Sequence, residues 1–318
     1  MTGKWKRLAV ICAIGGAWAL ASTPGIESYL YSMKGQAMQV DGKVDPLKEE
    51  IENNAKKYEV LPKDAMIDSV WKTVPGYNGL KVDIAASYEI MKKDGVFDEK
   101  KLIYKQIPPK IHLSELPAEP IYRAHPEKPV VSFLINVAWG NEYIPDMLKT
   151  LKKHNVKATF FLEGRWAKAN PELAKAIKEA GHEIGNHSFT HPNMKILSSE
   201  ATRKEIKDTN EVLKAITGEY PSLFAPPSGA FRSDTVRIAD EFGMDTIMWS
   251  VDTIDWQKPT PDVLTQRVLS KVHEGAFVLM HPTESTARSM ETLIVNIKKK
   301  GLHLKTVTES LKEERILH

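Results

Sequence analysis

The stretch Gly181–Pro192 reads G-H-E-I-G-N-H-S-F-T-H-P, a short strand pattern followed at once by a polar loop. Its two histidines, His187 and His191, lie four positions apart, so a single turn of chain can direct both rings at one ion. Imidazole nitrogens suit zinc and neighbouring transition metals. Taken alone, an H-x3-H pair is more often two loop histidines with ordinary hydrogen bonds. The flanking sequence therefore has to decide between these interpretations.

The flanking sequence alternates between strand and helix patterns from Pro129 onward. Strands are predicted at Val130–Val137, Ala158–Leu162, Glu183–Gly185, Leu223–Ala225, Thr246–Val251, Ala276–Met280 and near Leu304. Helices are predicted at Glu142–His154, Pro171–Ala180, Ser198–Thr217, Ser233–Phe242, Thr260–Val272 and Ser285–Lys300, with a short helix closing the chain. Such alternation over about 190 residues predicts an α/β fold with a parallel sheet. A sheet of this kind closed into a barrel carries its site at the C-terminal ends of the strands.

Three further polar segments follow predicted strands. They are Leu223–Ala230 (L-F-A-P-P-S-G-A), Val251–Trp256 (V-D-T-I-D-W) and Val278–Pro282 (V-L-M-H-P). Each is weak evidence alone, because a lone His281 is more often an ordinary hydrogen-bonded histidine, and Asp252 or Asp255 a cap or ion-pair partner. In this order, each at the end of a strand, the segments predict one site shared with His187 and His191.

This order of motifs resembles the polysaccharide deacetylase (NodB-like) domain of carbohydrate esterase family 4, over about Pro129–His318. It is most similar to the sporulation-associated, deacetylase-related proteins of spore-forming Gram-positive bacteria. The resemblance implies a distorted (β/α) barrel of about seven strands. It also implies metal-dependent removal of acetyl groups from glycans such as peptidoglycan or chitin.

The resemblance assigns roles to particular residues. The family motif H-S/T-x-x-H-P matches in full at His187–Pro192, which would make His187 and His191 metal ligands. The fourth motif resembles Asp252–Trp256, and Leu279-Met280-His281 resembles the fifth, whose histidine would be the general acid. The resemblance thus places in the site His281, Asp255 and Asp252 as catalytic residues, and Trp256, Leu279, Pro226, Pro227 and Ser228 along the substrate groove.

Two motifs of the family are altered. The intact K-A-T-F-F at Lys157–Phe161 anchors a count back without gaps, which sets Leu134–Ala138 against the family's T-F-D-D-G. Asn136 then stands at the position of the catalytic base, and Val137 at that of the third metal ligand. In the third motif, R-P-P-Y-G, Ala225 replaces the arginine that orients the base.

These replacements predict impaired chemistry. An amide cannot accept a proton at neutral pH, and general base action contributes about 10²–10⁴ in rate. A valine has no lone pair, and three protein ligands are usual at catalytic zinc. Zinc or another divalent metal is therefore expected to be weakly bound or absent. The base, the group that orients it and one metal ligand are all replaced. This combination favours loss of the deacetylase activity over a change in its specificity or rate.

Three functions remain open on this basis. The first is an exported, catalytically impaired deacetylase-family protein acting at the cell envelope, on or near peptidoglycan or another glycan containing N-acetylglucosamine. The second is a slow metal-dependent deacetylase that recruits another carboxylate, such as Glu142 or Asp252. The third is a glycan-binding or scaffolding protein whose role is set by its N-terminal region. A monomer is expected in each case.

The N-terminus has the pattern of a targeting segment within residues 1–28. Lys4, Lys6 and Arg7 precede the apolar run Leu8–Ala21, which ends in A-x-A, as in a cleaved signal peptide or an uncleaved membrane anchor. Either predicts an extracytoplasmic protein. The single cysteine, Cys12, lies inside this run, so the remaining chain has no disulfide and no thiolate ligand.

Composition describes an ordinary globular protein of 318 residues, with 42% hydrophobic and 27% charged residues. Three of the 44 basic residues lie in the N-terminal segment, which leaves 41 against 41 acidic residues. A neutral body gives no electrostatic case for nucleic-acid binding. Residues 29–118 predict a small α/β domain or spacer, with helices at Asp45–Tyr58 and Asp83–Lys93 and a strand at Leu102–Ile107. A proline-rich boundary separates it from residues 119–318.

Overall fold

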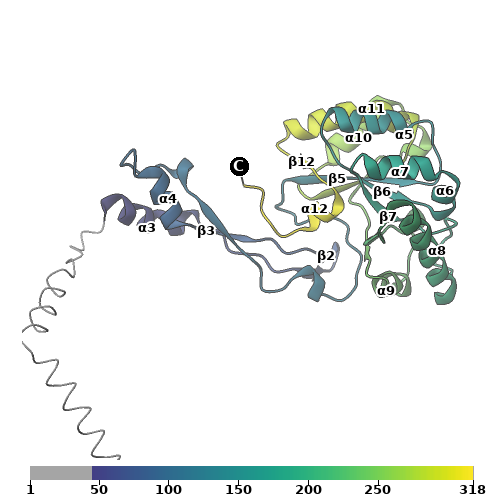
Figure 1. Ribbon diagram of the computed structural model, residues 1–318, viewed down its shortest axis with the longest axis horizontal. Coiled ribbons are helices and arrows are strands. Elements are labelled where there is room, and N and C mark those ends of the chain that lie inside the picture. The colour runs from purple at the N-terminus through teal and green to yellow at the C-terminus, as the bar shows by residue number, and fades with distance from the viewer. Residues whose placement is uncertain (1–44, 318) are drawn as a thin grey trace, which may run out of the picture. The chain divides into compact units, whose positions relative to one another are not determined.

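The computed structural model describes residues 45–317 of the chain (Figure 1). The predicted leader at 1–28 lies outside the described residues. The described chain divides into two compact units, one with residues 45–55 and Ile84–Ile103, the other with Lys56–Asp83 and residues 104–317. The units do not follow the predicted boundary near residue 118, because residues 56–83 and 104–118 lie in the same unit as the barrel. No helix between residues 45 and 317 is long and apolar enough to cross a membrane.

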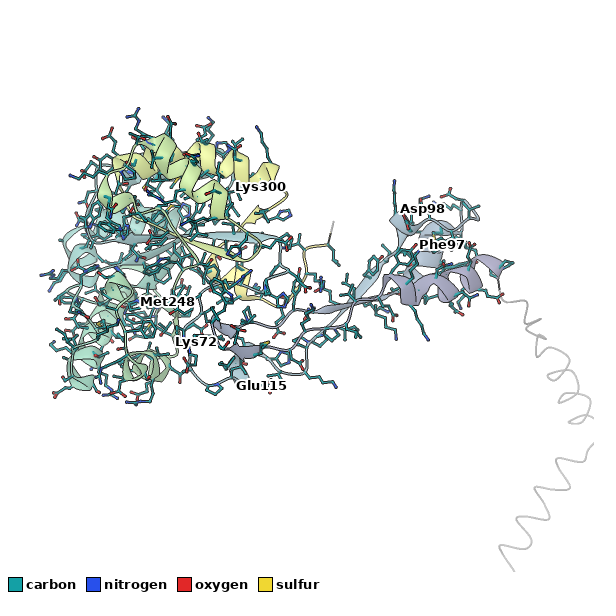
Figure 2. All side chains as sticks on the ribbon, turned by 180° about the vertical axis from the view of Figure 1, so that it is seen from behind. Lys72, Phe97, Asp98, Glu115, Met248 and Lys300 are labelled. Atoms are coloured by element: carbon teal, nitrogen blue, oxygen red, sulfur yellow. The ribbon has the colours of Figure 1, made fainter. Side chains whose placement is uncertain are left out.

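The first unit contains the start of α3 (Pro46–Tyr58), α4 (Ile84–Met91) and the 3-10 turn η1 (Glu99–Lys101). Pro46 occupies the first helical position, where a missing N–H costs nothing. The carboxylate of Asp45 accepts hydrogen bonds from the hydroxyl of Tyr88 at 2.7 Å and from the N–H of Leu47 at 2.9 Å. Asp98, labelled in Figure 2, caps η1 by accepting the N–H of Lys100.

The second unit is built on a curled parallel sheet in the order β10-β11-β5-β6-β7-β8-β9, with β12 also paired to β5. Every pairing in this sheet is parallel, as predicted from the alternation. The strands are β5 (Val130–Val137), β6 (Thr159–Leu162), β7 (Glu183–Asn186), β8 (Leu223–Phe224), β9 (Asp245–Thr246), β10 (Val251–Asp252), β11 (Ala276–Met280) and β12 (His303–Leu304). This half-barrel, with seven strands in its main order and β12 beside β5, confirms the predicted fold class.

The prediction of one strand at Thr246–Val251 is wrong. The segment forms two short strands, β9 and β10, which lie at opposite ends of the strand order. β9 pairs with β8, whereas β10 pairs with β11, and one straight strand cannot reach both partners.

A segment before the barrel helps to close its open side. Ile121 bridges Ile247 next to β9, and Arg123 bridges Ala276 of β11. The N–H of Ile121 donates to the carbonyl of Thr246 at 2.9 Å. Ile121 also bridges Lys72, labelled in Figure 2, in β2. The predicted proline-rich boundary is therefore partly a structural element of the barrel.

Two small antiparallel pairs precede the barrel in this unit. They are β1 (Met66–Asp68) with β2 (Lys72–Val74), and β3 (Gly79–Val82) with β4 (Tyr104–Ile107). Of these four strands only β4 was predicted. The first three are three or four residues long and lie among turn residues, so they lack a readable alternation.

Helices cover the sheet, and Figure 1 shows α5, α10 and α11 grouped on one side of it. The barrel helices are α5 (Ile144–Lys153), α6 (Gly164–Ala169), α7 (Pro171–Glu179), α8 (Ser199–Thr217), α9 (Ser233–Glu241), α10 (Pro261–Lys271), α11 (Glu284–Lys299) and α12 (Val307–Leu311). Of these, α6 was not predicted. It is only six residues long and starts where the buried carboxylate of Glu163 accepts the N–H of Trp166.

Alternation along β5 decides which residues reach the site. Val131, Phe133, Ile135 and Val137 belong to the cluster that includes the helix residues Met147 and Leu293. Leu134 belongs to a second cluster, with Phe161 and Phe277. Because side chains on a strand alternate between faces, Asn136 shares the face of Leu134 and lies at the C-terminal end of that face.

Candidate functional site

A cavity of about 460 Å³ lies at the C-terminal ends of the barrel strands. It is lined by Asn136, Ala138, Trp139, His187, His191, Ser228, Trp249, Asp252, Trp256, Leu279 and His281. Most of the residues predicted for the site therefore meet in one place. The cavity also contains Trp139 and Trp249, which the sequence analysis did not select. Their only signal was an aromatic residue close to the end of a predicted strand.

Five of the predicted site residues do not line this cavity. Val137 is 0% exposed and packs on the opposite face of β5 from Asn136. The side chain of Ala225 lies in the cluster of Leu134 and Phe161. Asp255 is fully buried behind His281. Pro226 and Pro227 are buried and precede Ser228, whose φ of 54° turns the backbone at the cavity.

His187 is held in one orientation by the backbone. It is 1% exposed, and its Nδ1 lies 2.8 Å from the carbonyl oxygen of Ala225. Because a carbonyl only accepts, Nδ1 carries the proton, which leaves the Nε2 lone pair free. Burial lowers the pKa of His187 to about 3. The ring is therefore neutral at physiological pH, which is the form that binds metals.

The loop carrying His191 is fixed from outside by Glu205 of α8. One carboxylate oxygen of Glu205 accepts the N–H groups of Phe189 and Thr190 at 2.8 and 2.7 Å. The backbone of His191 has a φ of 56°, and its ring centroid lies 5.1 Å from that of His187. The two rings thus lie edge to face at the cavity, and their binding of one shared ion stays a prediction.

His281 is held by a buried carboxylate. Asp255 is 0% exposed and accepts three hydrogen bonds: from the backbone N–H of His281 at 2.6 Å, from its Nδ1 at 2.8 Å, and from the hydroxyl of Thr286 at 2.7 Å. The ring also stacks on Trp139, with centroids 5.9 Å apart and planes 9° from parallel. Nε2 of His281 is therefore the ring nitrogen available to the cavity.

Asn136 differs from its neighbours in lacking a partner. It is 4% exposed, and its Oδ1 is buried without a hydrogen bond. Most buried polar atoms in proteins are hydrogen-bonded, so this oxygen is an unused acceptor at the cavity wall.

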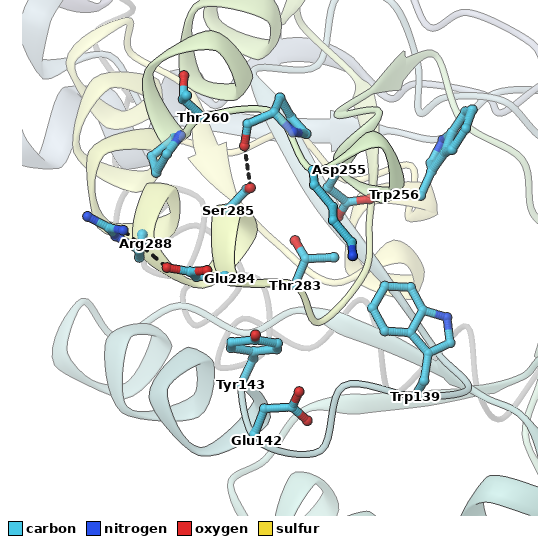
Figure 3. A pocket seen from close by; sticks show the side chains of 13 residues that line it. Trp139, Glu142, Tyr143, Asp255, Trp256, Thr260, Thr283, Glu284, Ser285 and Arg288 are labelled. Atoms are coloured by element: carbon cyan, nitrogen blue, oxygen red, sulfur yellow. Dashed lines mark hydrogen bonds and ion pairs between the residues drawn. The ribbon is translucent and has the colours of Figure 1, made fainter.

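A second cavity of about 550 Å³ adjoins the first (Figure 3). The two cavities share Trp139 and Trp256, which are 46% and 57% exposed. Figure 3 shows Glu142 and Tyr143 on one side of this second cavity and Thr283 and Ser285 across from them. Exposed tryptophans beside paired hollows present flat apolar faces, which suit the apolar faces of sugar rings.

The loops on the two sides of the cavity touch through their backbones. A Cβ atom added to Gly140, which has a φ of 81°, would lie 2.0 Å from the carbonyl oxygen of Pro282. Gly140 follows Trp139 and Pro282 follows His281, so this close approach sets the distance between the loops that carry those two side chains.

The donor set fits a catalytic metal only in part. His187 and His191 supply two imidazole ligands. Val137 has no lone pair, and its side chain packs on the face of β5 away from the cavity. Within residues 45–317, no group of three or more His, Cys, Asp or Glu side chains is placed to hold a metal ion. Because three protein ligands are usual at catalytic zinc, these residues do not make a complete site.

Comparison with known proteins agrees with this geometry. Residues 123–247 match the family described as Polysaccharide deacetylase. The uncharacterized protein YlxY of Bacillus subtilis (strain 168) is 53% identical over 301 residues, which cover 95% of this chain and 94% of that protein. The chain belongs to the polysaccharide deacetylase family, carbohydrate esterase family 4.

Solved structures extend the comparison. The wild-type CE4 family pseudoenzyme from Bacillus anthracis matches with a TM-score of 0.82 and 55% identity, over 85% of this chain and 96% of that one. A mutant of that pseudoenzyme with restored enzymatic activity matches equally well, with a TM-score of 0.82. The peptidoglycan-N-acetylglucosamine deacetylase PgdA of Listeria monocytogenes is 39% identical over 166 residues, covering 52% of this chain and 35% of that enzyme.

Proposed function

We propose that this protein is an exported member of the family that acts at the cell envelope, with its deacetylase chemistry lost or strongly impaired, and that its cavity binds a glycan containing N-acetylglucosamine, such as peptidoglycan. The observation that carries the proposal is Asn136, an amide at the position of the base, inside a cavity whose other walls are intact. Such a cavity can bind and orient a sugar, but the side chain at the position of the family's base cannot take a proton from water.

The impairment follows from what each retained residue can do. His281, fixed by Asp255, can hold or donate a proton at Nε2 toward a leaving nitrogen. The opposite role, accepting a proton from an attacking water, falls to Asn136, whose amide is not basic at neutral pH. A metal bound by three ligands would polarise the acetyl group in this family, but the chain supplies only two imidazoles. Acid catalysis alone leaves the attack on the amide unassisted.

Glycan binding is supported by the shape of the site and by the relatives. Two adjoining cavities with shared tryptophan walls suit consecutive sugar units of one chain. The name of the Listeria relative gives peptidoglycan N-acetylglucosamine as its substrate. The pseudoenzyme from B. anthracis, similar over most of this chain, indicates that loss of activity on this fold leaves a folded protein.

The test combines binding, metal content and turnover in one preparation. Purified protein should bind chitotetraose and peptidoglycan fragments, release little or no acetate from either, and carry well under one equivalent of zinc by elemental analysis. Acetate release at the rate of an active family member, measured beside it on the same substrate, would refute the impairment. Failure to bind any of these glycans would refute the binding function.

A slow deacetylase is the second candidate, favoured by the position of Asp252. Asp252 lines the same cavity as His187 and His191, whereas Glu142 lines the second cavity. One oxygen of Asp252 already accepts the N–H of Ile254 at 2.8 Å, so the other would have to act as base or ligand. If residual acetate release exists, Asp252→Asn should abolish it and Glu142→Gln should not.

The location is tested separately. The basic residues and apolar run at the N-terminus support export, either with cleavage or as an anchor. Fractionation of the source cells, with an antibody to the barrel, should find the protein outside the cytoplasm or at the membrane. Recovery of the untruncated chain in the cytoplasmic fraction would contradict export.

A further inference from the structure

We propose that Asn136 makes the cavity a reader of the N-acetyl group: its Oδ1 accepts the N–H of an acetamido substituent, so that the protein binds N-acetylated sugars and discriminates against the free amine. This inference rests on the proposed glycan-binding function and names the chemical feature that the site recognises. It gives Asn136 a binding role at the position where the base stands in active members of the family.

The first support is the unsatisfied acceptor. In the described part of the chain, seven residues carry a buried side-chain nitrogen or oxygen without a partner, and of these only Asn136 lines the cavity. A buried acceptor without a donor destabilises the folded protein. Such an atom at a cavity wall is explained if a ligand supplies the donor, and the N–H of a secondary amide is a donor of the right kind.

The surrounding walls favour an acetamido group over an ammonium group. Ala138, Trp249 and Leu279 line the same cavity as Asn136 and provide apolar surface on which an acetyl methyl can pack. The free amine of a deacetylated sugar is protonated at neutral pH, and burying an unpaired charge is strongly unfavourable. Asp252 is the only carboxylate among the cavity-lining residues, and one of its oxygens is already occupied by the N–H of Ile254. The balance of these contacts favours the neutral group.

The proposal predicts that a substitution of Asn136 weakens ligand binding without lowering the stability of the free protein. Replacing Asn136 by leucine removes an unpaired acceptor and adds apolar surface in a buried place, so the melting temperature of the free protein should not fall. The same change removes the acceptor for the ligand's N–H. An asparagine held in place only by packing would show the opposite result, with lower stability and unchanged binding.

The experiment measures dissociation constants by calorimetry for chitotetraose and for its fully deacetylated counterpart. The wild-type protein should prefer chitotetraose by at least about tenfold. Asn136→Leu should weaken chitotetraose binding by about ten- to a hundredfold, the usual range for one buried hydrogen bond. Asn136→Ala serves as a second variant, because its small side chain cannot block the cavity.

Asn78 provides a matched control. It also carries a buried Oδ1 without a partner, but it does not line the cavity. Asn78→Leu should leave both dissociation constants unchanged.

Two outcomes would overturn the inference while leaving glycan binding in place: equal affinity of the wild-type protein for both oligomers, or wild-type affinity in both Asn136 variants. If the wild-type protein bound neither oligomer nor peptidoglycan fragments, the proposed function and this inference would fall together. Lower stability of both variants with unchanged affinity would assign Asn136 to packing.

Discussion

Restoring both aspartates tests whether the chemistry was lost with two side chains or with the fold. We expect the single variant Asn136→Asp to do little. The new carboxyl would be 4% exposed, at a position where the existing oxygen receives no hydrogen bond. Burial without donors raises the pKa of a carboxylic acid, so this group would be protonated when it is needed as a base.

The second aspartate has a measurable cost because of where Val137 lies. Val137 is 0% exposed and packs among apolar residues, so Val137→Asp places a carboxylate in the core unless the strand end turns toward the cavity. Without metal we expect the free energy of unfolding to fall by about 3–5 kcal/mol, as for an uncompensated buried charge. Zinc at a hundredfold excess over its dissociation constant should return about 2.7 kcal/mol.

Activity of the double variant requires that zinc draw the new carboxylate at position 137 into the cavity by turning the end of β5, and we expect activity once it does so. The metal's charge favours the ionised form of both aspartates, and a working general base contributes about 10²–10⁴ in rate, or about 2.7–5.4 kcal/mol in activation free energy. In the motif that this chain resembles, the residue at position 225 is an arginine that orients the base, so the triple variant with Ala225→Arg should be the most active.

The assay follows acetate release from chitotetraose with zinc and with a chelator, alongside zinc-dependent melting temperatures. Wild-type activity equal to that of the repaired variants would show that the missing groups are not required. A repaired variant that binds zinc stoichiometrically and remains inert would refute the reasoning in the other direction, because the groove itself would then be unfit for catalysis.

Three further predictions concern the intact protein. Burial lowers the pKa of His182 to about 4, so the unfolded state takes up its proton first, and stability present above about pH 6.5 is lost as the pH falls toward 4. Between pH 7 and 4.5, the free energy of unfolding measured in urea should fall by about 2 kcal/mol less in His182→Asn than in the wild type, and equal losses would contradict this. Asp255→Ala leaves the donors on His281 and Thr286 unpaired, and we expect unfolding to become easier by about 2–4 kcal/mol; an unchanged denaturation midpoint would show that these bonds contribute nothing. Trp139→Ala and Trp256→Ala should each raise the dissociation constant for chitotetraose about tenfold or more, measured by calorimetry. If either change weakened the binding of N-acetylglucosamine but not of chitotetraose, the site would not span both cavities.

The fold was predictable because local signals agreed with each other. Pro171 and Pro261 begin helices at the positions where proline is tolerated, and Ser198 caps α8 by accepting the N–H of Ala201. The β9–β10 region was not predictable in this way. The segment Thr246–Val251 carries the same apolar signal whether it forms one strand or joins strands at the two ends of a curled sheet. Only the pairing partners distinguish these cases.

The site was predictable where a motif sets the geometry and unpredictable where distant residues do. His187 and His191 lie together because four positions separate them. Glu205, which fixes their loop, is 14 positions beyond His191 on a helix with no motif of its own. The orientation of Val137 away from Asn136 follows from strand alternation, but its meaning for a metal site required the packing on both faces of β5.

The contact of Gly140 with Pro282 bears on how such a protein can change roles. At this contact the backbone of Gly140 meets the backbone carbonyl and the ring of Pro282, so a side chain at position 140 has no room. Asn136 lies at the cavity wall and is no part of this contact, so a substitution there changes the chemistry of the cavity and leaves the contact in place. The contact between the two loops and the reactive side chains of the cavity depend on separate positions. Mutation can therefore replace the reactive side chains while a sugar of the same size still fits. A residue with a side chain at position 140 would do the reverse. It would leave every functional group in place and push apart the two loops that carry Trp139 and His281.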